Sequence, residues 1–449
     1  MDRETATPRI DSMPGERARA WVEHHREAAA PSEHSHAFVW DITADAEGPF
    51  VTDVDGNVLM DFTCHIGAAP LGYGNPKILE KVREFDLVEP LKIAGQDLYF
   101  AGGNGLDDRE FPGSSRLMHE LVDRSSQYGH DTVFLSNSGG EAVENAMKVA
   151  YDACERPKYG ITFTGAFHGR TLGTLSITRA KDVYTRKFPE IAGIREVPFC
   201  ADRTCSPGTC DCGFFRGSGS RSRLEELFAP EFRSLDPAEV AYIVMEPIQG
   251  VGGYNFPSEA FTSEVARVSE RYDIPLIVDE IQTGVGRSGR MWASDHYDLE
   301  PDLITAGKAL RVGATVGRGE LFPDEPNRLG STWGGGDVVS SMYGVFTLEA
   351  IDEYDLTANA TERGRQMREL LADADPEGVV DVRGLGLLLA VEFDTAERRD
   401  AVVEAALSRG LMTLGCGKKT VRLLPPLDVT EREIELGGSL FVESVEAVA

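Results

Sequence analysis

The chain has 449 residues, of which 41% are hydrophobic, and its 47 glycines and 23 prolines are dispersed along it. This size and composition indicate a globular protein of two packed lobes and argue against a disordered chain. The formal net charge of −29 argues against a nucleic-acid or anionic-membrane partner, because phosphate groups would repel the protein.

The acidity also bears on source and compartment. Only ten of the 45 basic residues are lysines, a balance that resembles cytosolic proteins of salt-loving archaea, in which concentrated salt screens self-repulsion. An ordinary acidic enzyme is the alternative. The longest apolar runs, such as 385–391, are far shorter than a membrane span, and the N-terminus has no signal-peptide pattern. We therefore expect a cytoplasmic protein, of a halophilic archaeon, with no membrane partner.

The first segment predicts a surface arm and a small meander. Residues 1–36 are charged and histidine-rich, and residues 38–62 alternate apolar and polar side chains around Asp55-Gly56. Such alternation about an Asp-Gly pair is typical of antiparallel strands joined by a tight hairpin. We expect residues 1–70 to form this arm and meander and to join a small domain.

Helix-period segments then alternate with short apolar runs. The helical segments include 115–125 and 140–154, and the apolar runs include "DTVFLS", "YGITFTG", "VAYIVMEP" and "IPLIVDE". This rhythm predicts a mostly parallel sheet wrapped by helices, in a large domain over 71–335. In residues 336–449 helices mix with strands, which predicts a small α+β domain.

Four of the predicted strands end in polar, glycine-rich turns: "FLSNSGGE", "FTGAFHGRT", "VMEPIQGVGG" and "IVDEIQTGVG". Ligands of open parallel sheets bind at the carboxyl ends of the strands. In the first turn, Ser138, Gly139 and Gly140 would offer a hydroxyl and N–H groups at a helix start, which suits a phosphate. A plain helix cap is the alternative.

Lys308 follows the short apolar run of "DLITAGKAL", and Asp279 ends the strand of "IPLIVDE". A lysine in apolar surroundings loses its proton easily, as a Schiff-base former must, although a solvated surface lysine is the more frequent case. Together with a phosphate site, an amine and a strand-end carboxylate are what pyridoxal phosphate requires.

With these parts together, the sequence resembles the class III aminotransferases, which are fold-type I pyridoxal-phosphate enzymes. The resemblance runs from "FVTDVDGNVLMDF" to "VRLLPPLDV", and "IVDEIQTGVGRSG" is its most specific motif. It implies an α/β fold with a mostly parallel seven-stranded sheet in the large domain, a small α+β domain, and pyridoxal 5'-phosphate as cofactor.

The resemblance also implies roles for individual residues. Lys308 matches the Schiff-base lysine, and Asp279 the carboxylate that holds the protonated pyridine nitrogen. The other residues matched to cofactor binding are Ser138, Gly139 and Gly140 at the phosphate, Phe167 stacked on the ring, Gln282 near the phenolic oxygen, His168, Glu246 and Thr332. Thr332 matches a threonine that reaches the phosphate from a neighbouring subunit, which implies a homodimer with a shared active site.

Two arginines match positions that bind substrate carboxylates, Arg170 in "FHGRT" and Arg422 in "TVRLLPPL". Forked hydrogen bonding suits an arginine to a carboxylate. Arg170 could instead form an interface or helix-start salt bridge, and Arg422 a structural ion pair. Many relatives that act on ω-amino acids carry a second glutamate in "EPIQGEGG", which pairs with the arginine at the Arg422 position. Val251 stands there in this chain, so we expect Arg422 to remain open to a carboxylate unless another acid replaces that glutamate.

The implied activity is an amino transfer from an ω-amino or basic amino acid, such as 4-aminobutyrate, lysine or ornithine, to 2-oxoglutarate by a ping-pong Schiff-base mechanism. An amino-acid racemase of the same fold is one alternative. A class III aminotransferase that uses pyruvate or glyoxylate as acceptor is another. A noncatalytic scaffold is disfavoured because all cofactor-binding parts are present.

A cysteine cluster lies in a loop between sheet elements, in "CADRTCSPGTCDC". Cys200, Cys205, Cys210 and Cys212 could hold a structural zinc ion as thiolates. Their spacing is not the usual paired CxxC, so a labile disulfide and free thiols remain alternatives.

Overall fold

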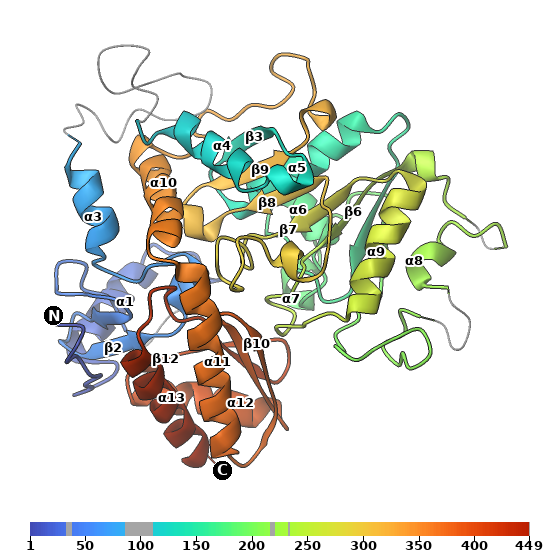
Figure 1. Cartoon of the computed structure of the whole chain (residues 1–449). Helices are drawn as coiled ribbons and strands as arrows, with labels where there is room; N and C mark the ends of the chain where they lie inside the picture. Colours follow the sequence, from blue (N-terminus) through green and yellow to red (C-terminus); the bar gives the residue numbers. More distant parts are fainter. Residues whose placement is uncertain (33–37, 86–110, 216–220, 232–233, 449) are drawn as a thin grey trace. The chain divides into compact units, whose positions relative to one another are not determined.

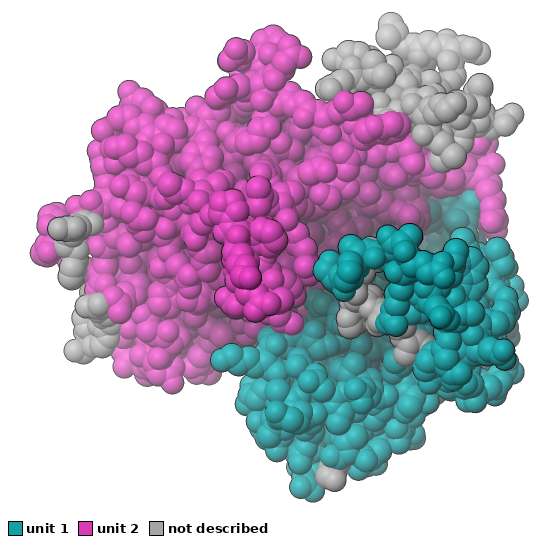
Figure 2. All heavy atoms as spheres, turned by 180° about the vertical axis from the view of Figure 1, so that it is seen from behind, with its two compact units in different colours: residues 1–79, 356–449 teal, residues 80–355 magenta. Residues whose placement is uncertain are grey.

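The computed structural model describes residues 1–32, 38–85, 111–215, 221–231 and 234–448 (Figure 1). The chain divides into two compact units, which Figure 2 colours separately: unit 1 holds residues 1–79 and 356–449, and unit 2 holds residues 80–355. The sequence analysis placed the boundaries at 70/71 and 335/336. The second boundary of the structure falls later because helix α10 (Val338–Glu353) packs on helix α4 (Ser114–Asp123) within unit 2.

Unit 2 is built on a seven-stranded sheet in the order β3-β9-β8-β7-β6-β4-β5. Only β9 runs antiparallel to its neighbours, so the predicted mostly parallel sheet is confirmed. The strands are β3 (Thr132–Ser136), β4 (Tyr159–Phe163), β5 (Ile194–Val197), β6 (Val240–Met245), β7 (Leu276–Asp279), β8 (Leu303–Ala306) and β9 (Gly313–Gly317).

Helices cover both faces of this sheet. On one face, α5 (Gly139–Ala153) packs its apolar side against Tyr242 and Val244 of β6. On the other, α9 (Glu259–Tyr272) packs against Ile243 and Met245 of the same strand. Because alternate residues of a strand point to opposite faces, a strand covered on both sides must be apolar throughout, as β6 is.

The remaining helical segments of unit 2 are short and mostly follow strand ends. They are α6 (Leu172–Ile177), α7 (Asp182–Thr185), α8 (Arg223–Glu226) and the 3-10 turns η1 (Ser126–Tyr128), η2 (Pro237–Glu239), η3 (Ala293–His296), η4 (Lys308–Leu310) and η5 (Gly319–Leu321). Helix α3 (Pro76–Arg83) spans the first boundary between the units.

Unit 1 combines the two ends of the chain. The predicted hairpin forms from β1 (Phe50–Thr52) and β2 (Val58–Asp61), and β12 (Leu411–Met412) adds to β2 in parallel. A second sheet has the order β10-β11-β14-β13, from β10 (Val379–Leu385), β11 (Leu388–Phe393), β14 (Thr420–Leu423) and β13 (Leu414–Cys416). The helices of unit 1 are α1 (Glu16–Arg26), α2 (Cys64–Gly67), α11 (Leu356–Ala374), α12 (Ala396–Ser408) and α13 (Glu431–Glu446).

Among the described residues, no helix combines the length and the apolar composition needed to cross a bilayer.

Candidate active site

Strand β7 ends in two buried carboxylates that have different surroundings. Glu280 is 1% exposed, and its Oε1 accepts hydrogen bonds from the backbone N (2.7 Å) and the Oγ (2.8 Å) of Ser294, while Thr283 Oγ1 donates to Oε2. Burial raises the pKa of Glu280. This carboxylate ties the loop after β7 to η3, so its role is to hold the backbone.

Asp279 instead bonds to a histidine. Its Oδ2 lies 2.8 Å from Nδ1 of His168, and its Oδ1 accepts from the backbone N of Ile281 at 3.1 Å and from Oγ1 of Thr305 at 3.3 Å. His168 is fixed in turn by Thr178, whose Oγ1 accepts from the His168 backbone N at 3.1 Å. The side chain of His168 is fully buried, and its Nε2 has no hydrogen-bond partner among the described residues. The imidazole therefore orients the carboxylate.

Glu246 follows β6 and holds two turns of the site. Its Oε1 accepts from the backbone N of Phe167 at 2.9 Å, and its Oε2 from the backbone N of Gly250 at 2.8 Å. Burial raises the pKa of Glu246 to about 7; the nearby His168 opposes this shift, and the negative charge of Asp279 adds to it. The carboxyl of Glu246 therefore titrates near neutral pH, and both members of the Asp279–His168 pair affect its pKa.

The start of α5 lies at the same edge of the sheet. Oγ of Ser138 accepts from the backbone N of Glu141 at 3.2 Å, so this serine caps the helix, whereas the phosphate site stays a prediction. A Cβ built on Gly140 would meet nothing closer than 3.8 Å, whereas one on Gly139 would lie 2.8 Å from Cδ1 of Ile281. The protein itself leaves space at Gly140, and a helix of this length with free space at its first turn suits an anion.

Lys308 lies close to the start of α5, because Gly307, the residue before it, packs against Gly139 and Ile281. It begins η4 directly after β8 with φ +26, a backbone conformation that a lysine adopts only when its surroundings impose it. A Cβ built on Gly307 would lie 3.4 Å from Cγ2 of Ile281 and 3.5 Å from Cα of Gly139. Ile281 thus packs against both the lysine turn and the helix start, and its own N bonds to Asp279.

Phe167 and Arg170 lie in the turn between β4 and α6. The Phe167 ring is half-buried and packs edge-on against Tyr184, with centroids 5.6 Å apart. The guanidinium of Arg170 lies over the Tyr184 ring, 4.3 Å from its centroid, and the side chain is exposed. Among the described residues, no carboxylate forms an ion pair with Arg170. The described residues therefore give no support to a helix-start salt bridge, and the interface salt bridge stays a prediction.

The remaining predicted residues are placed as follows. A Cβ on Gly250 would lie 2.3 Å from Oε1 of Gln282 and 3.5 Å from Oε2 of Glu246, so Gln282 lies beside the glutamate turn. Thr332 is exposed, in the segment between η5 and α10, which lies beside the end of β3: the backbone N of Gly335 donates to the Ser136 carbonyl at 3.3 Å.

Arg422 lies in unit 1, on β14, and is 6% exposed. It pairs across the sheet with Ala390 on one side and Leu414 on the other. Arg383 of the same sheet forms ion pairs with Asp381 at 2.8 Å and Glu392 at 2.9 Å, which mark it as structural.

These residues fit pyridoxal phosphate. The cofactor needs a lysine amine, a site for its phosphate and a carboxylate for its ring nitrogen. Unit 2 brings all three to the carboxyl edge of one sheet: the lysine turn, the open helix start, and a carboxylate held by a histidine.

Sequence reasoning missed the residues that support this site. Thr305 donates to Asp279, and Thr178 accepts from the backbone N of His168. The ring of Tyr184 lies under the guanidinium of Arg170. Ile281 contacts the lysine turn and the start of α5. The pairing of Asp279 with Thr305 across β7 and β8 could have been found from strand register. The others depend on loop conformations that no periodicity predicts.

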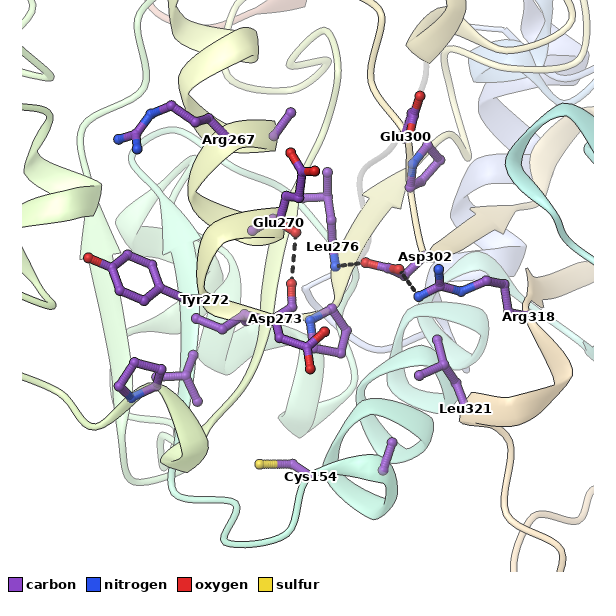
Figure 3. A pocket seen from close by; sticks show the side chains of 18 of the residues that line it. Cys154, Arg267, Glu270, Tyr272, Asp273, Leu276, Glu300, Asp302, Arg318 and Leu321 are labelled. Atoms are coloured by element: carbon purple, nitrogen blue, oxygen red, sulfur yellow. Dashed lines mark hydrogen bonds and ion pairs between the residues drawn. The ribbon is translucent and has the colours of Figure 1, made fainter.

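The hollow drawn in Figure 3 lies at the opposite, amino-terminal edge of the same sheet. Its volume is about 1100 Å³, and it is lined by residues at the starts of β6, β7 and β8. In it, Oδ2 of Asp302 accepts from the backbone N of Leu276 at 2.7 Å, and Asp302 forms an ion pair with Arg318. None of the predicted cofactor or substrate residues lines it.

The four loop cysteines lie in unit 2 after β5, away from these residues in sequence, and they pack beside the sheet face that α9 covers.

Comparison with known proteins adds the family. The model of the family "Aminotransferase class-III" matches residues 30–445. A putative LysW-aminoadipate semialdehyde/glutamate semialdehyde transaminase of Pyrobaculum aerophilum is 32% identical over 399 residues, which cover 86% of this chain and 91% of the relative. A probable 4-aminobutyrate aminotransferase of Bacillus subtilis is 30% identical over 425 residues, covering 90% and 93%. The solved lysine aminotransferase of M. tuberculosis, in its internal aldimine form, superposes with a TM-score of 0.83 at 26% identity, over 96% of this chain and 100% of that one.

Proposed function

The chain belongs to the class III aminotransferase family, a family of pyridoxal-phosphate-dependent transaminases, and from this premise we propose that it transfers an amino group from an ω-amino or basic amino acid to 2-oxoglutarate. The observation that carries the proposal is the meeting of Lys308, the start of α5 and the Asp279–His168 pair around Ile281. A cytoplasm of high salt is its proposed setting, in keeping with a net charge of −29.

In this proposal, Ser138, Gly139 and Gly140 at the start of α5 would hold the phosphate, because N–H groups and the helix dipole there favour an anion. Phe167 would cover the ring, and Asp279 would accept a hydrogen bond from its protonated nitrogen. When bound, pyridoxal phosphate supplies an aldehyde that bonds to an amine and a ring that withdraws electrons from the substrate carbon that bears this amine.

The amine of Lys308 then has two tasks. It would hold the cofactor covalently, and once freed it would move a proton from the substrate carbon to the cofactor's C4′ carbon, as general base and then general acid. Asp279 would keep the ring nitrogen protonated, because His168 fixes its orientation and Thr305 donates to its other oxygen. Gln282 lies beside Glu246 and would face the phenolic oxygen.

The donor class is supported by the relatives and by the two arginines. The relatives are named for 4-aminobutyrate, lysine or semialdehyde chemistry. In the ω-amino donors that we propose, the reacting nitrogen lies far from the carboxylate. A substrate carboxylate requires a cation at a distance from Lys308, and we assign that part to Arg170 and Arg422. Val251 places no acidic side chain at its position, and by the resemblance we propose that Arg422 binds a substrate carboxylate.

A donor screen tests this proposal. The purified enzyme is incubated with single amino donors and 2-oxoglutarate, and glutamate is measured; pyruvate and glyoxylate replace the acceptor in parallel. We expect glutamate from at least one of 4-aminobutyrate, lysine and ornithine. Inversion of an α-amino acid without any acceptor would indicate the racemase instead, and turnover with pyruvate or glyoxylate alone would correct the acceptor.

The lysine is tested separately by borohydride reduction and peptide mapping of the enzyme with its cofactor. We expect the label on Lys308. A label on another of the ten lysines would contradict the assignment.

A homodimer is also proposed, because Thr332 is exposed in the single chain and matches a residue that reaches a neighbouring phosphate. Light scattering should give twice the chain mass of 48.9 kDa. A Thr332→Ala subunit mixed with a Lys308→Ala subunit should regain part of the activity, since one of the two shared sites in a mixed dimer then has both residues. No regain on mixing would contradict a shared site.

A further inference from the structure

The loop after β5 gathers four cysteines that the aminotransferase chemistry does not use. Sγ atoms of Cys200, Cys205 and Cys212 all lie within 4.8 Å of one another, and Sγ of Cys210 lies 3.1 Å from that of Cys212. The thiol of Cys205 also contacts that of Cys210. From these positions we propose that the four cysteines bind one zinc ion as thiolates.

The mutual spacing favours a metal over disulfides. Four thiolates at about 2.3 Å from one zinc ion lie roughly 3.8 Å apart, so every sulfur has several sulfur neighbours. In a disulfide each sulfur has one partner at about 2.05 Å, and the pair turns away from other thiols. Here the Cys212 sulfur lies 3.1 Å from that of Cys210 and within 4.8 Å of those of Cys200 and Cys205, so it has three sulfur neighbours, as a shared centre requires.

The surroundings of the cluster also fit a metal centre. Cys200 is fully buried and Cys205 is 3% exposed, and both belong to the apolar core that packs under α9. The backbone N of Phe215 donates to Sγ of Cys210 at 3.4 Å, and Oγ of Ser258 donates to Sγ of Cys200 at 3.8 Å. Donors aimed at sulfur are the outer contacts that orient and stabilise metal-bound thiolates.

The loop's own hydrogen bonds form only local turns, such as the bond from the backbone N of Thr204 to Oδ1 of Asp202 at 2.8 Å. Between Cys200 and Cys212 it contains no helix or strand, and apart from the cysteines its only apolar side chains are Ala201 and Pro207. A short chain segment that cannot bury apolar side chains requires a crosslink or a metal to be fixed. The ion would clamp this loop to the sheet, where the backbone N of Phe199 donates to Thr164 Oγ1 at 2.9 Å, three residues before Phe167.

The test measures zinc in the full chain, purified without a metal-binding tag. We expect about one zinc ion per chain, against at least a tenfold lower content in Cys205→Ser and in Cys212→Ser. Cys154→Ser is the matched control, because Cys154 is half-buried outside the cluster, with its Sγ 3.5 Å from the Ala238 carbonyl. The control should keep its zinc.

Two measurements on the unmutated protein keep the proposal testable if the variants do not fold. Thiols titrated in denaturant without reductant but with a chelator should number seven, and cobalt exchanged for zinc should give the intense thiolate-to-metal absorption of a four-sulfur centre. Seven thiols without bound metal, fewer than seven thiols, or zinc that persists in both cluster variants would each overturn the proposal. Because none of these readouts involves turnover, they do not depend on the proposed function.

Discussion

The carboxylates at the two edges of the large sheet in unit 2 have different bonding partners. At the amino-terminal edge, carboxylates meet arginines and lysines: Asp302 pairs with Arg318, and Glu239 pairs with Lys158 at 2.5 Å. At the carboxyl edge, the carboxylates of Asp279 and Glu246 are 5% and 6% exposed, and among the described residues they bond to backbone N–H groups, one hydroxyl and one histidine.

This difference teaches where to look for chemistry in such a fold. Half-exposed ion pairs cost little to form and contribute little, so they need no function to explain them. Buried carboxylates without a cationic side chain to neutralise them are costly, and they persist where a ligand or a reaction uses them. The hollow of about 1100 Å³ lies at the edge with the ordinary ion pairs, so its size does not mark the active site.

The largest difference between the two edges is expected when one lysine at each edge is replaced by alanine. Lys308→Ala should lower kcat by at least about 10⁴-fold, because the same amine binds the cofactor and moves the proton. Lys158→Ala removes an exposed lysine at the start of β4, at the amino edge, and should leave kcat within about twofold. Steady-state glutamate formation measures both. Equal losses in the two variants would abolish the distinction between the edges.

A second pair of variants compares carboxylates on neighbouring strands. Asp279→Asn should lower kcat about 10³-fold, because an amide cannot keep the ring nitrogen protonated, while the free energy of unfolding changes little. Asp302→Asn should do the reverse: it weakens the ion pair with Arg318 and costs up to about 1 kcal/mol in stability, with kcat unchanged.

Urea unfolding and kcat, measured on both variants, separate the two effects. If Asp302→Asn lowers kcat as far as Asp279→Asn does, the hollow at the amino edge takes part in the reaction.

Much of this contrast could be predicted from the sequence, and part could not. The strand run ending in Asp279, the glycine turn at Ser138 and the lysine after a short apolar run follow from local pattern, since each depends on a few adjacent residues. The structure confirms the mostly parallel sheet that brings their strand ends to one edge.

The support of the site could not be predicted, because it joins residues distant in sequence. His168 meets Asp279 across 111 positions, and Glu246 meets the Phe167 backbone across 79. Neither separation leaves a periodic signal. Likewise, nothing in the motif "VDE" tells which of the two carboxylates faces the site, and only the Ser294 contacts show that Glu280 is the structural one.

A smaller effect is expected in the pH dependence of stability, because of Glu246 at the carboxyl edge. Burial raises the pKa of Glu246 from 4.5 to about 7, so the folded state keeps a proton that the unfolded state has released. The stability that this group contributes is therefore complete below pH 4.5 and is lost as the pH rises through about 7.

Glu246→Gln has no such proton. From pH 5 to pH 8, the free energy of unfolding of the unmutated protein should fall by about 2 kcal/mol relative to the variant. Chemical unfolding of both cofactor-free proteins at the two pH values measures this difference. A constant difference would mean that Glu246 carries the same charge as an ordinary surface carboxylate.

The smallest expected effect is that of Gly140→Ala at the start of α5. This substitution should change the affinity for the cofactor without changing the stability of the fold. A Cβ on Gly140 meets nothing within 3.8 Å, so Gly140→Ala should fold with an unchanged melting temperature. It should nevertheless weaken pyridoxal phosphate binding about tenfold, because a phosphate must approach the backbone N–H groups that the methyl group would screen.

The neighbouring glycine supplies the matched control. Gly139→Ala presses on Ile281 at 2.8 Å and should cost about 1–2 kcal/mol in stability before any ligand is added. Cofactor titration followed by absorbance, with melting curves of both variants, tests the pair. If Gly140→Ala binds pyridoxal phosphate as tightly as the unmutated protein does, the phosphate lies elsewhere and this helix start is only a cap. In that case the carboxyl edge would keep its buried carboxylates but lose its anion site, and the contrast between the two edges would depend on Asp279 and Lys308 alone.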